Sequence, residues 1–223
     1  KLGLDEATLR FAETRMEAIP DGLLRQLTWM AIYELVRDGR YPAARYAQLL
    51  IDRLPHEVDS SIVQGVVEST LGGLLLRYLP DGEREEWGSR IVQAARERLA
   101  RGGSEAMRIV WSRVLGLAAV TPRDVEEGWQ VAVGETPLDG VEIDQDYRWA
   151  LLIRGASFGL PQSAERLRAE AARDPSDRGE RALLTAAAAA PTIPAKREAW
   201  EKIFTADGYG SVKRTLAATA GFA

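Results

Sequence analysis

The chain has 223 residues, of which 29 are Lys or Arg and 33 are Asp or Glu, so its formal net charge is -4. This balance has the wrong sign for a protein that neutralises phosphates, and nucleic acid is not an expected partner. The absence of cysteine excludes disulfides and thiolate metal sites and favours the cytoplasm. No apolar run approaches the ~20 residues of a membrane span, and no basic-then-apolar leader opens the sequence. We therefore expect no membrane partner.

A first helix is predicted over residues 6–18, with Asp5 as its N-cap, and a helical hairpin follows in residues 25–50. Gly39 ends the first helix of this hairpin, and Pro42 suits the first turn of the second. Because so few residues join the two helices, they must fold back antiparallel. The core-facing stripe of the first one is predicted to be Leu24, Leu27, Ala31 and Leu35, widened by Trp29, Met30, Ile32 and Val36.

The middle of the chain continues with helices separated by turn residues. One long helix is predicted from Asp59 or Ser60 to residue 78, with glycines that let a neighbour approach closely. A helix over 83–101 is stopped by a glycine pair, and Ser104 caps the next. Those glycines are Gly65, Gly72 and Gly73 in the long helix and Gly102 and Gly103 after residue 101.

Further helices are predicted up to the end of the chain, after one longer loop. Thr121 and Pro122 begin a helix by the N-cap and proline rule, and residues 134–143, which include Gly140, form the loop. The remaining helices are expected over 147–158, 161–173, 181–190 and 211–220, with one more that contains Thr192, Pro194 and Trp200 before a turn at 207–210.

Helices with a charged outer face alternate with helices that are almost entirely small or apolar. Six such pairs would give ~37 residues each, close to the period of HEAT-type arrays, in which stacking completes the core. No segment alternates as a strand does. The sequence predicts an all-α chain, an α–α superhelix or HEAT/armadillo-like solenoid, forming a single helical-repeat domain over residues 1–223.

No residue emerges as a candidate catalytic, cofactor-binding or metal-binding residue. His56 is the one histidine, and without a second histidine or a cysteine it is expected at the surface. Four acidic residues could gather a cation, but they lack the EF-hand spacing and are expected to solvate a loop and charge a helix N-terminus. These four are Asp139, Glu142, Asp144 and Asp146.

The tryptophans and one glycine-rich turn allow two further interpretations. Six tryptophans could line a peptide groove, but helical spacing predicts that each packs in the core. The segment Gly208-Tyr209-Gly210 is expected to be a turn, because no Lys-Ser/Thr follows as in a phosphate-binding loop. The tryptophans are Trp29, Trp87, Trp111, Trp129, Trp149 and Trp200.

Four segments together resemble the C-terminal helical domain of the actinobacterial-type zinc aminopeptidase N family. They are LTWMAIYELVRDGRYPAARYAQLL (27–50), SSIVQGVV (60–67), DYRWALLIRGASFG (146–159) and RLRAEAARDPSDRGERALLTAAAAAPTIPAKREAWEKIF (166–204). The resemblance implies a helical superhelix that closes over the active site of a thermolysin-like domain elsewhere in the parent protein. It also implies that this catalytic domain binds zinc and acts on peptide substrates. The catalytic domain would be the partner of this chain.

The catalytic motifs of that family are absent from this sequence. H-E-x-x-H needs two histidines and G-x-M-E-N needs an asparagine, whereas the chain has one histidine and no asparagine. We therefore expect a noncatalytic domain that walls a peptide chamber and controls access to it. A free-standing HEAT-like scaffold is the alternative, and a helical-repeat DNA glycosylase is a more distant one that the acidic balance disfavours.

Both ends suggest a piece of a longer protein. The first residue is Lys1, and the last helix remains apolar almost to Ala223, through Leu216, Ala217, Ala220 and Phe222. Because natural arrays end in a hairpin with a polar outer face, we expect either self-association through the C-terminal helices or fraying of the chain from about Asp207 onward.

Overall fold

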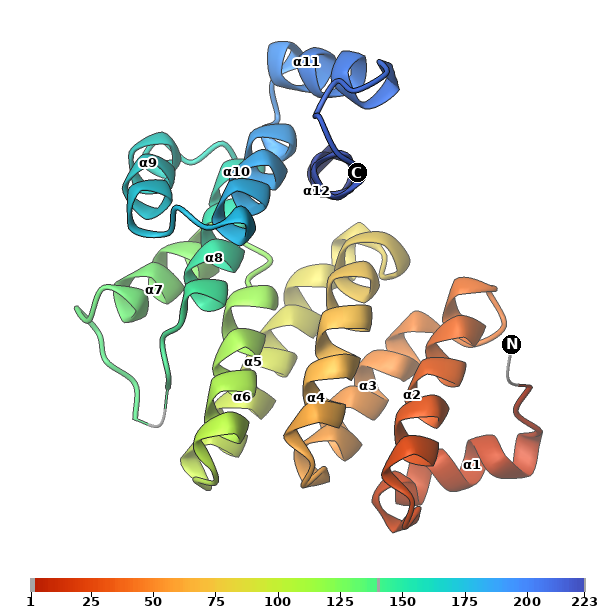
Figure 1. Ribbon diagram of the computed structural model, residues 1–223. Helices are drawn as coiled ribbons and strands as arrows, with labels where there is room; N and C mark the ends of the chain where they lie inside the picture. The colour runs from red at the N-terminus through yellow and green to blue at the C-terminus, as the bar shows by residue number, and fades with distance from the viewer. Residues whose placement is uncertain (1–2, 140, 223) are drawn as a thin grey trace. The chain divides into compact units, whose positions relative to one another are not determined.

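The computed structural model describes residues 3–139 and 141–222, which form helices and connecting turns with no strand (Figure 1). The prediction of an all-α chain is confirmed; Lys1, Gly140 and Ala223 lie outside the described residues. The helices are α1 (Glu6–Arg15), α2 (Gly22–Arg37), α3 (Ala43–Arg53), α4 (Ser60–Val66), α5 (Arg84–Ala100), α6 (Glu105–Leu117), α7 (Pro122–Ala132), α8 (Gln145–Ser157), α9 (Ser163–Arg173), α10 (Asp177–Ala189), α11 (Ile193–Phe204) and α12 (Val212–Phe222), with short helices η1 (Met16–Ala18), η2 (Leu54–His56), η3 (Val67–Leu71), η4 (Leu74–Tyr78) and η5 (Asp81–Glu83).

The helices group into two compact units, the first formed by Lys1–Val120 with Leu138–Glu142 and the second by Thr121–Pro137 with Ile143–Ala223. In the first unit α1, α3 and α5 contact one another in one layer, and α2, α4 and α6 form the other layer (Figure 1). The hairpin of α2 and α3, joined through Gly39 at φ 69°, is as predicted. Each helix is therefore buried by a neighbour within its layer and by the layer opposite.

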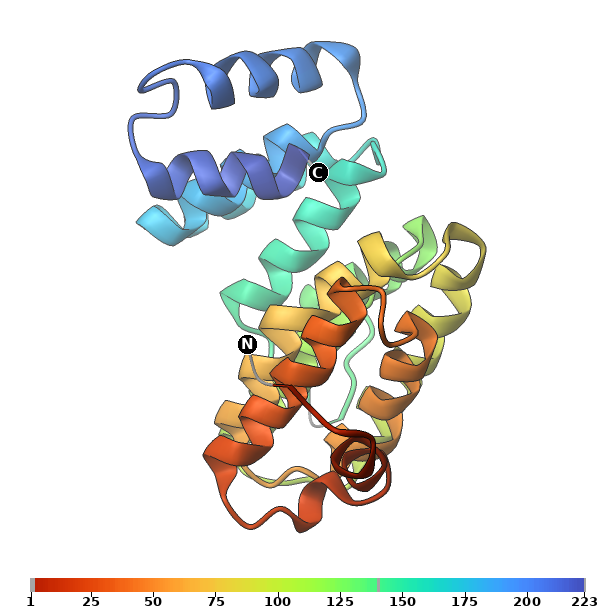
Figure 2. The ribbon, with the colours of Figure 1, turned by 90° about the vertical axis from the view of Figure 1, so that its right-hand side faces the viewer.

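The second unit repeats this arrangement. Its α8, α10 and α12 pack side by side, α7 and α9 cover α8, and α11 lies against α10 and α12. Figure 2 shows α11 and α12 as an antiparallel pair. The contact between α10 and α12 is close because it is made by small residues: Gly221 lies directly against the backbone of Thr185.

Most helix ends follow the predicted capping. The side chains of Asp5 and Ser104 accept hydrogen bonds from the amides of Thr8 and Met107. Thr121 and Asp124 form a capping box at the start of α7. Because these caps satisfy amides that a helix start leaves unpaired, the residue types alone located several of the helix starts.

The long helix predicted up to residue 78 differs from expectation in its winding. It is α-helical over Ser60–Val66 and then forms two π-helical segments, η3 and η4, with an α-helical step at residues 72–73 between them. Two glycines lie together between these segments, and Gly73 packs against the hydroxyl of the buried Tyr33. Within η4 the adjacent residues Leu74 and Leu75 are both buried.

The core-facing side of α2 also differs from the predicted stripe. Ala31 is buried, but Leu24 and Leu27 are 47% and 42% exposed. The buried arc is wide, as expected, but it is displaced around the helix. It consists of Arg25, Thr28, Trp29, Ala31, Ile32, Tyr33 and Val36.

One buried ion pair fixes a helix end in each unit. In the first, Arg25 Nε donates to Glu57 Oε2 at 2.8 Å and the guanidinium also reaches the carbonyl of Ile19 at 2.8 Å. In the second, Arg148 Nε on α8 donates to Glu170 Oε1 on α9 at 2.7 Å. A buried charge that loses its partner is very costly, so these pairs restrict how the helices can pack.

A second buried link joins α8 to the turn before α10. Trp149 is 3% exposed, and its Nε1 donates to Asp174 Oδ2 at 2.9 Å. Asp174 Oδ1 accepts from the Ser176 hydroxyl at 2.6 Å. The hydrogen bond from Ser176, and to a smaller extent the one from Trp149, lowers the pKa of Asp174 below its ordinary value.

The neighbouring glycines of the long helix give a matched test of close packing. Gly73→Ala should destabilise the protein by about 1–3 kcal/mol, because the new methyl group meets the Tyr33 hydroxyl. Gly72→Ala, which meets nothing within 4 Å, should be neutral or stabilising by up to about 1 kcal/mol. Urea unfolding measures both, and equal effects would contradict the packing described for Gly73.

Trp149→Ala should cost about 3–5 kcal/mol, because it leaves a cavity in the second unit. Trp149→Phe keeps most of the volume but removes the donor to Asp174, so about 1–3 kcal/mol is expected. A carboxyl whose pKa is lowered in the folded state stabilises the protein above its unfolded pKa of ~3.9, and this stabilisation is lost as the pH falls.

Thermal unfolding of Trp149→Phe should therefore lose less stability on acidification than thermal unfolding of the wild type. An unchanged unfolding midpoint in Trp149→Ala would refute the burial of Trp149.

Candidate interaction surfaces

The residues considered as metal ligands lie apart from any ligand group. His56 is exposed at the end of η2. Among residues 3–139 and 141–222, no three His, Cys, Asp or Glu side chains gather to hold a metal ion. The catalytic family motifs missing from the sequence are therefore not replaced by a ligand set from distant parts of the described chain.

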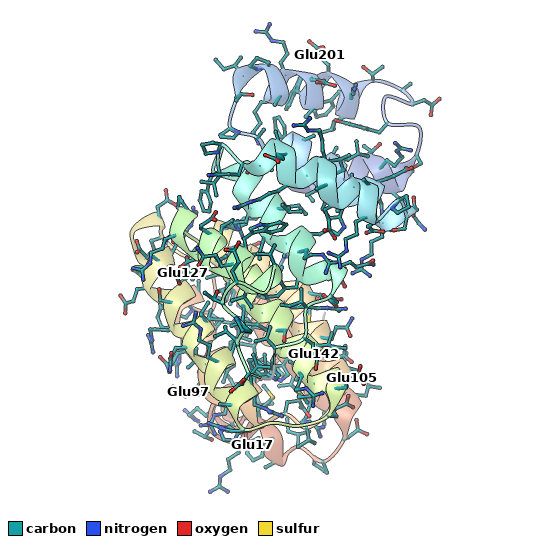
Figure 3. All side chains as sticks on the ribbon, turned by 90° about the vertical axis from the view of Figure 1, so that its left-hand side faces the viewer. Glu17, Glu97, Glu105, Glu127, Glu142 and Glu201 are labelled. Atoms are coloured by element: carbon teal, nitrogen blue, oxygen red, sulfur yellow. The ribbon has the colours of Figure 1, made fainter. Side chains whose placement is uncertain are left out.

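Three of the acidic residues near the long loop instead serve helix ends and ion pairs. Glu142, labelled in Figure 3, accepts from Arg108 Nε at 3.2 Å. Asp144 caps α8 by accepting from the amide of Tyr147 at 2.9 Å. Asp146 pairs with Arg178 at 2.5 Å, and Asp139 is exposed. Structural partners thus account for three of the four carboxylates.

The tryptophans divide into three groups. Trp29, Trp111 and Trp149 are buried, as predicted. Trp87 and Trp129 are half-buried and lie under guanidinium groups, those of Arg90 at 4.2 Å and Arg166 at 5.0 Å from the ring centroids. Trp200 is 54% exposed, so the prediction that it belongs to the core is wrong. The buried residue of its helix, α11, is Ala199, whose small side chain permits the close approach of α11 to its neighbours.

The segment Gly208-Tyr209-Gly210 is a turn between α11 and α12, as predicted. Asp207 has φ 56° there, and Gly208 lies directly against the backbone of Lys202. Any side chain at residue 208 would collide with that backbone, so this glycine is required by packing.

One apolar pocket lies within the first unit, between α3, η3, α5 and α6. Its cavity volume of about 20 Å³ is room for about one water molecule, which is too small for a peptide side chain. The lining is almost entirely apolar: Leu50, Ile51, Leu54, Val67, Leu71, Ile91, Ala94, Trp111 and Val114. This pocket is therefore a packing defect rather than a ligand site.

Exposed apolar side chains mark two surfaces that could bind a partner. The α2 leucine face consists of Leu23, Leu24 and Leu27, of which Leu23 is 67% exposed. Helical spacing in the sequence predicts Leu24, Leu27 and Trp200 as core residues, whereas Leu216 belongs to the C-terminal stripe that is expected to self-associate. The second, the α11–α12 apolar face, consists of Ile193, Trp200, Phe204, Val212 and Leu216.

No helix in the described chain is long and apolar enough to cross a membrane. Independently of that finding, the exposed apolar stripes suit other protein segments, because helices in stacked arrays bury such stripes against further helices or chains.

Comparison with known proteins agrees with the helical architecture. The family model described as ERAP1-like C-terminal domain matches residues 1–222. Aminopeptidase N of Streptomyces lividans is 30% identical over 209 residues, which cover 93% of this chain and 24% of that protein. The chain thus spans about a quarter of the length of this relative. On the match over nearly its whole length, the chain belongs to the ERAP1-like C-terminal domain family.

Proposed function

We propose that the chain is the noncatalytic C-terminal domain of a zinc aminopeptidase, and that it walls the chamber over the active site and controls the entry of peptides. The observation that carries this proposal is the family match over residues 1–222, together with the similarity to a protein named Aminopeptidase N. The removal of N-terminal residues from peptides would be performed by a catalytic domain elsewhere in the parent protein.

The residues of this chain do not fit a zinc site of their own. No metal-binding group occurs among the described residues, and the sequence lacks H-E-x-x-H. Zinc is therefore proposed for the parent's catalytic domain alone, and no chemical step is assigned to any residue here. We place the parent protein in the cytoplasm, a proposal that rests on the lack of cysteine.

The α2 leucine face is the surface that we propose for contact with the catalytic domain. Its three leucines share one side of a helix whose other side is buried in the first unit. Apolar stripes of this kind are rarely left to solvent in a protein made of stacked helices. The α11–α12 apolar face would provide a different contact, with a second copy of the chain.

A free-standing helical scaffold remains the alternative, and the same exposed leucines favour it, because they would suit any protein partner. The coding sequence upstream of Lys1 distinguishes the peptidase domain from the scaffold. An H-E-x-x-H motif a few hundred residues before Lys1 would favour the peptidase domain. A start codon directly before Lys1 would favour the scaffold.

The proposal predicts how the isolated chain and the parent enzyme behave. The chain alone should bind no stoichiometric zinc and cleave no aminoacyl substrate, because it has no ligand set. In the parent enzyme, Leu23→Asp with Leu27→Asp should alter the cleavage of long peptides, while cleavage of a single-residue aminoacyl amide changes by less than about threefold.

The matched control for this experiment is Val58→Asp, which places the same charge at a valine that is 85% exposed and outside the α2 leucine face. It should leave both activities unchanged. One tightly held zinc ion per isolated chain, or peptide cleavage unaffected by removal of the whole domain, would contradict the proposed function.

A further inference from the structure

The α11–α12 apolar face is the largest group of exposed apolar side chains in the second unit. On α11, Ile193, Trp200 and Phe204 recur at seven and four residues, which places them on one side of the helix. On α12, Val212 and Leu216 are one turn apart. All five side chains are more than half exposed, from 54% at Trp200 to 76% at Ile193.

The two stripes form one surface because the opposite sides of both helices are occupied. Ala199 and Ala218 are buried together with Ala188 of α10. The Trp200 ring lies 4.4 Å from that of Phe204 and 5.8 Å from that of Phe222, centroid to centroid, so aromatic rings connect α11 to α12. Because α11 and α12 contact each other and neither stripe includes the residues packed against Ala188, we treat the two stripes as one face.

This hairpin is held in place firmly enough to present a defined surface. Lys196 of α11 donates from Nζ to the carbonyls of Ala188 at 2.8 Å and Phe222 at 3.1 Å, which joins the C-terminal ends of α10 and α12. The Thr185 hydroxyl on α10 donates to the carbonyl of Ala217 at 3.0 Å. Neither contact uses a residue of the α11–α12 apolar face.

The area of this face matches what a stable protein contact needs. With roughly 150–250 Å² for each large aromatic side chain and somewhat less for the aliphatic ones, the exposed fractions give on the order of 600 Å². This is at the upper end of the ~300–600 Å² of the largest apolar patch on a typical monomer. It also approaches the ~800 Å² that each partner buries in a standard interface.

The charges at the rim favour a second copy of the chain as the partner. Arg197 and Glu201 lie one turn apart along the exposed side of α11, and Figure 3 shows Glu201 on the side of α11 that faces away from the rest of its unit. Neither side chain has an ion-pair partner among the described residues. In an antiparallel, two-fold pairing of α11 with itself, Arg197 of each copy meets Glu201 of the other.

We propose that the α11–α12 apolar face binds the same face of a second copy of this chain about a two-fold axis, with two reciprocal Arg197–Glu201 ion pairs at its rim. Trp200 and Phe204 would lie in the centre of the interface, where aromatic side chains carry most of the binding free energy. This inference deepens the self-association proposed above and does not depend on the peptidase assignment.

Sedimentation equilibrium of the 223-residue chain tests the proposal. The wild-type chain should dimerise with a Kd on the order of micromolar. Phe204→Ser should weaken the dimer by roughly thirtyfold, and because Phe204 is 69% exposed, the variant should keep its helical circular dichroism. Val58→Ser, outside this face, is the control and should leave the Kd unchanged.

Charge reversal provides the decisive comparison. Glu201→Arg and Arg197→Glu should each weaken the dimer by about tenfold, because like charges then meet at both rim positions. The double variant should restore the wild-type Kd, which a merely structural effect of either change would not do.

A wild-type chain that stays monomeric, a dimer insensitive to Phe204→Ser, or a longer parent chain that is monomeric with Trp200 shielded from quenchers would each overturn the inference. None of these measurements involves peptide hydrolysis, so their failure leaves the proposed function untouched, and loss of the proposed function leaves them interpretable.

Discussion

Both units depend on one constraint: neighbouring helices approach each other closely at glycine residues. Gly73 lies against the hydroxyl of Tyr33 in the first unit, and Gly221 lies against the backbone of Thr185 in the second. Each helix buries its apolar side only because a neighbour fits at these points. Larger residues there would separate the neighbouring helices and expose the side chains that stabilise them.

Polar contacts then determine how the closely packed helices are oriented. The Arg25–Glu57 and Arg148–Glu170 pairs are buried beside helix ends, and Trp149 donates to Asp174 at the start of the next helix. Apolar packing is non-directional, whereas a buried charge or indole donor has a defined partner and geometry. The two kinds of interaction together explain why an Ala-rich chain with few aromatic residues has a defined arrangement within each unit.

The sequence was informative about helix ends and less so about which apolar stripe is buried. Residues such as Asp5, Ser104 and Thr121 act through local hydrogen bonds, so their roles could be predicted without knowledge of the fold. Helical spacing favoured the largest apolar side chains as core. In α11 the interior instead receives Ala199, because the neighbouring helices come too close for Trp200.

The same limit explains why the α2 leucine face and the α11 part of the α11–α12 apolar face were not predicted, whereas the apolar stripe of the last helix, with Leu216, was expected to associate. The apolar stripe of Ile193, Trp200 and Phe204 has the spacing of a buried face, and its exposure depends on which other helices are present. Likewise the displacement of the buried arc on α2 follows from the position of its neighbours α3 and α4, which no local pattern encodes.

The π-helical segments η3 and η4 contain more residues than an α-helix of the same length would need. A π turn contains one residue more than the α turn it replaces, so deletion of a single residue there would restore ordinary winding and need not shift the helix ends. Related chains could thus differ in length inside this helix while their connecting turns stay the same. In most helical proteins such differences are confined to loops.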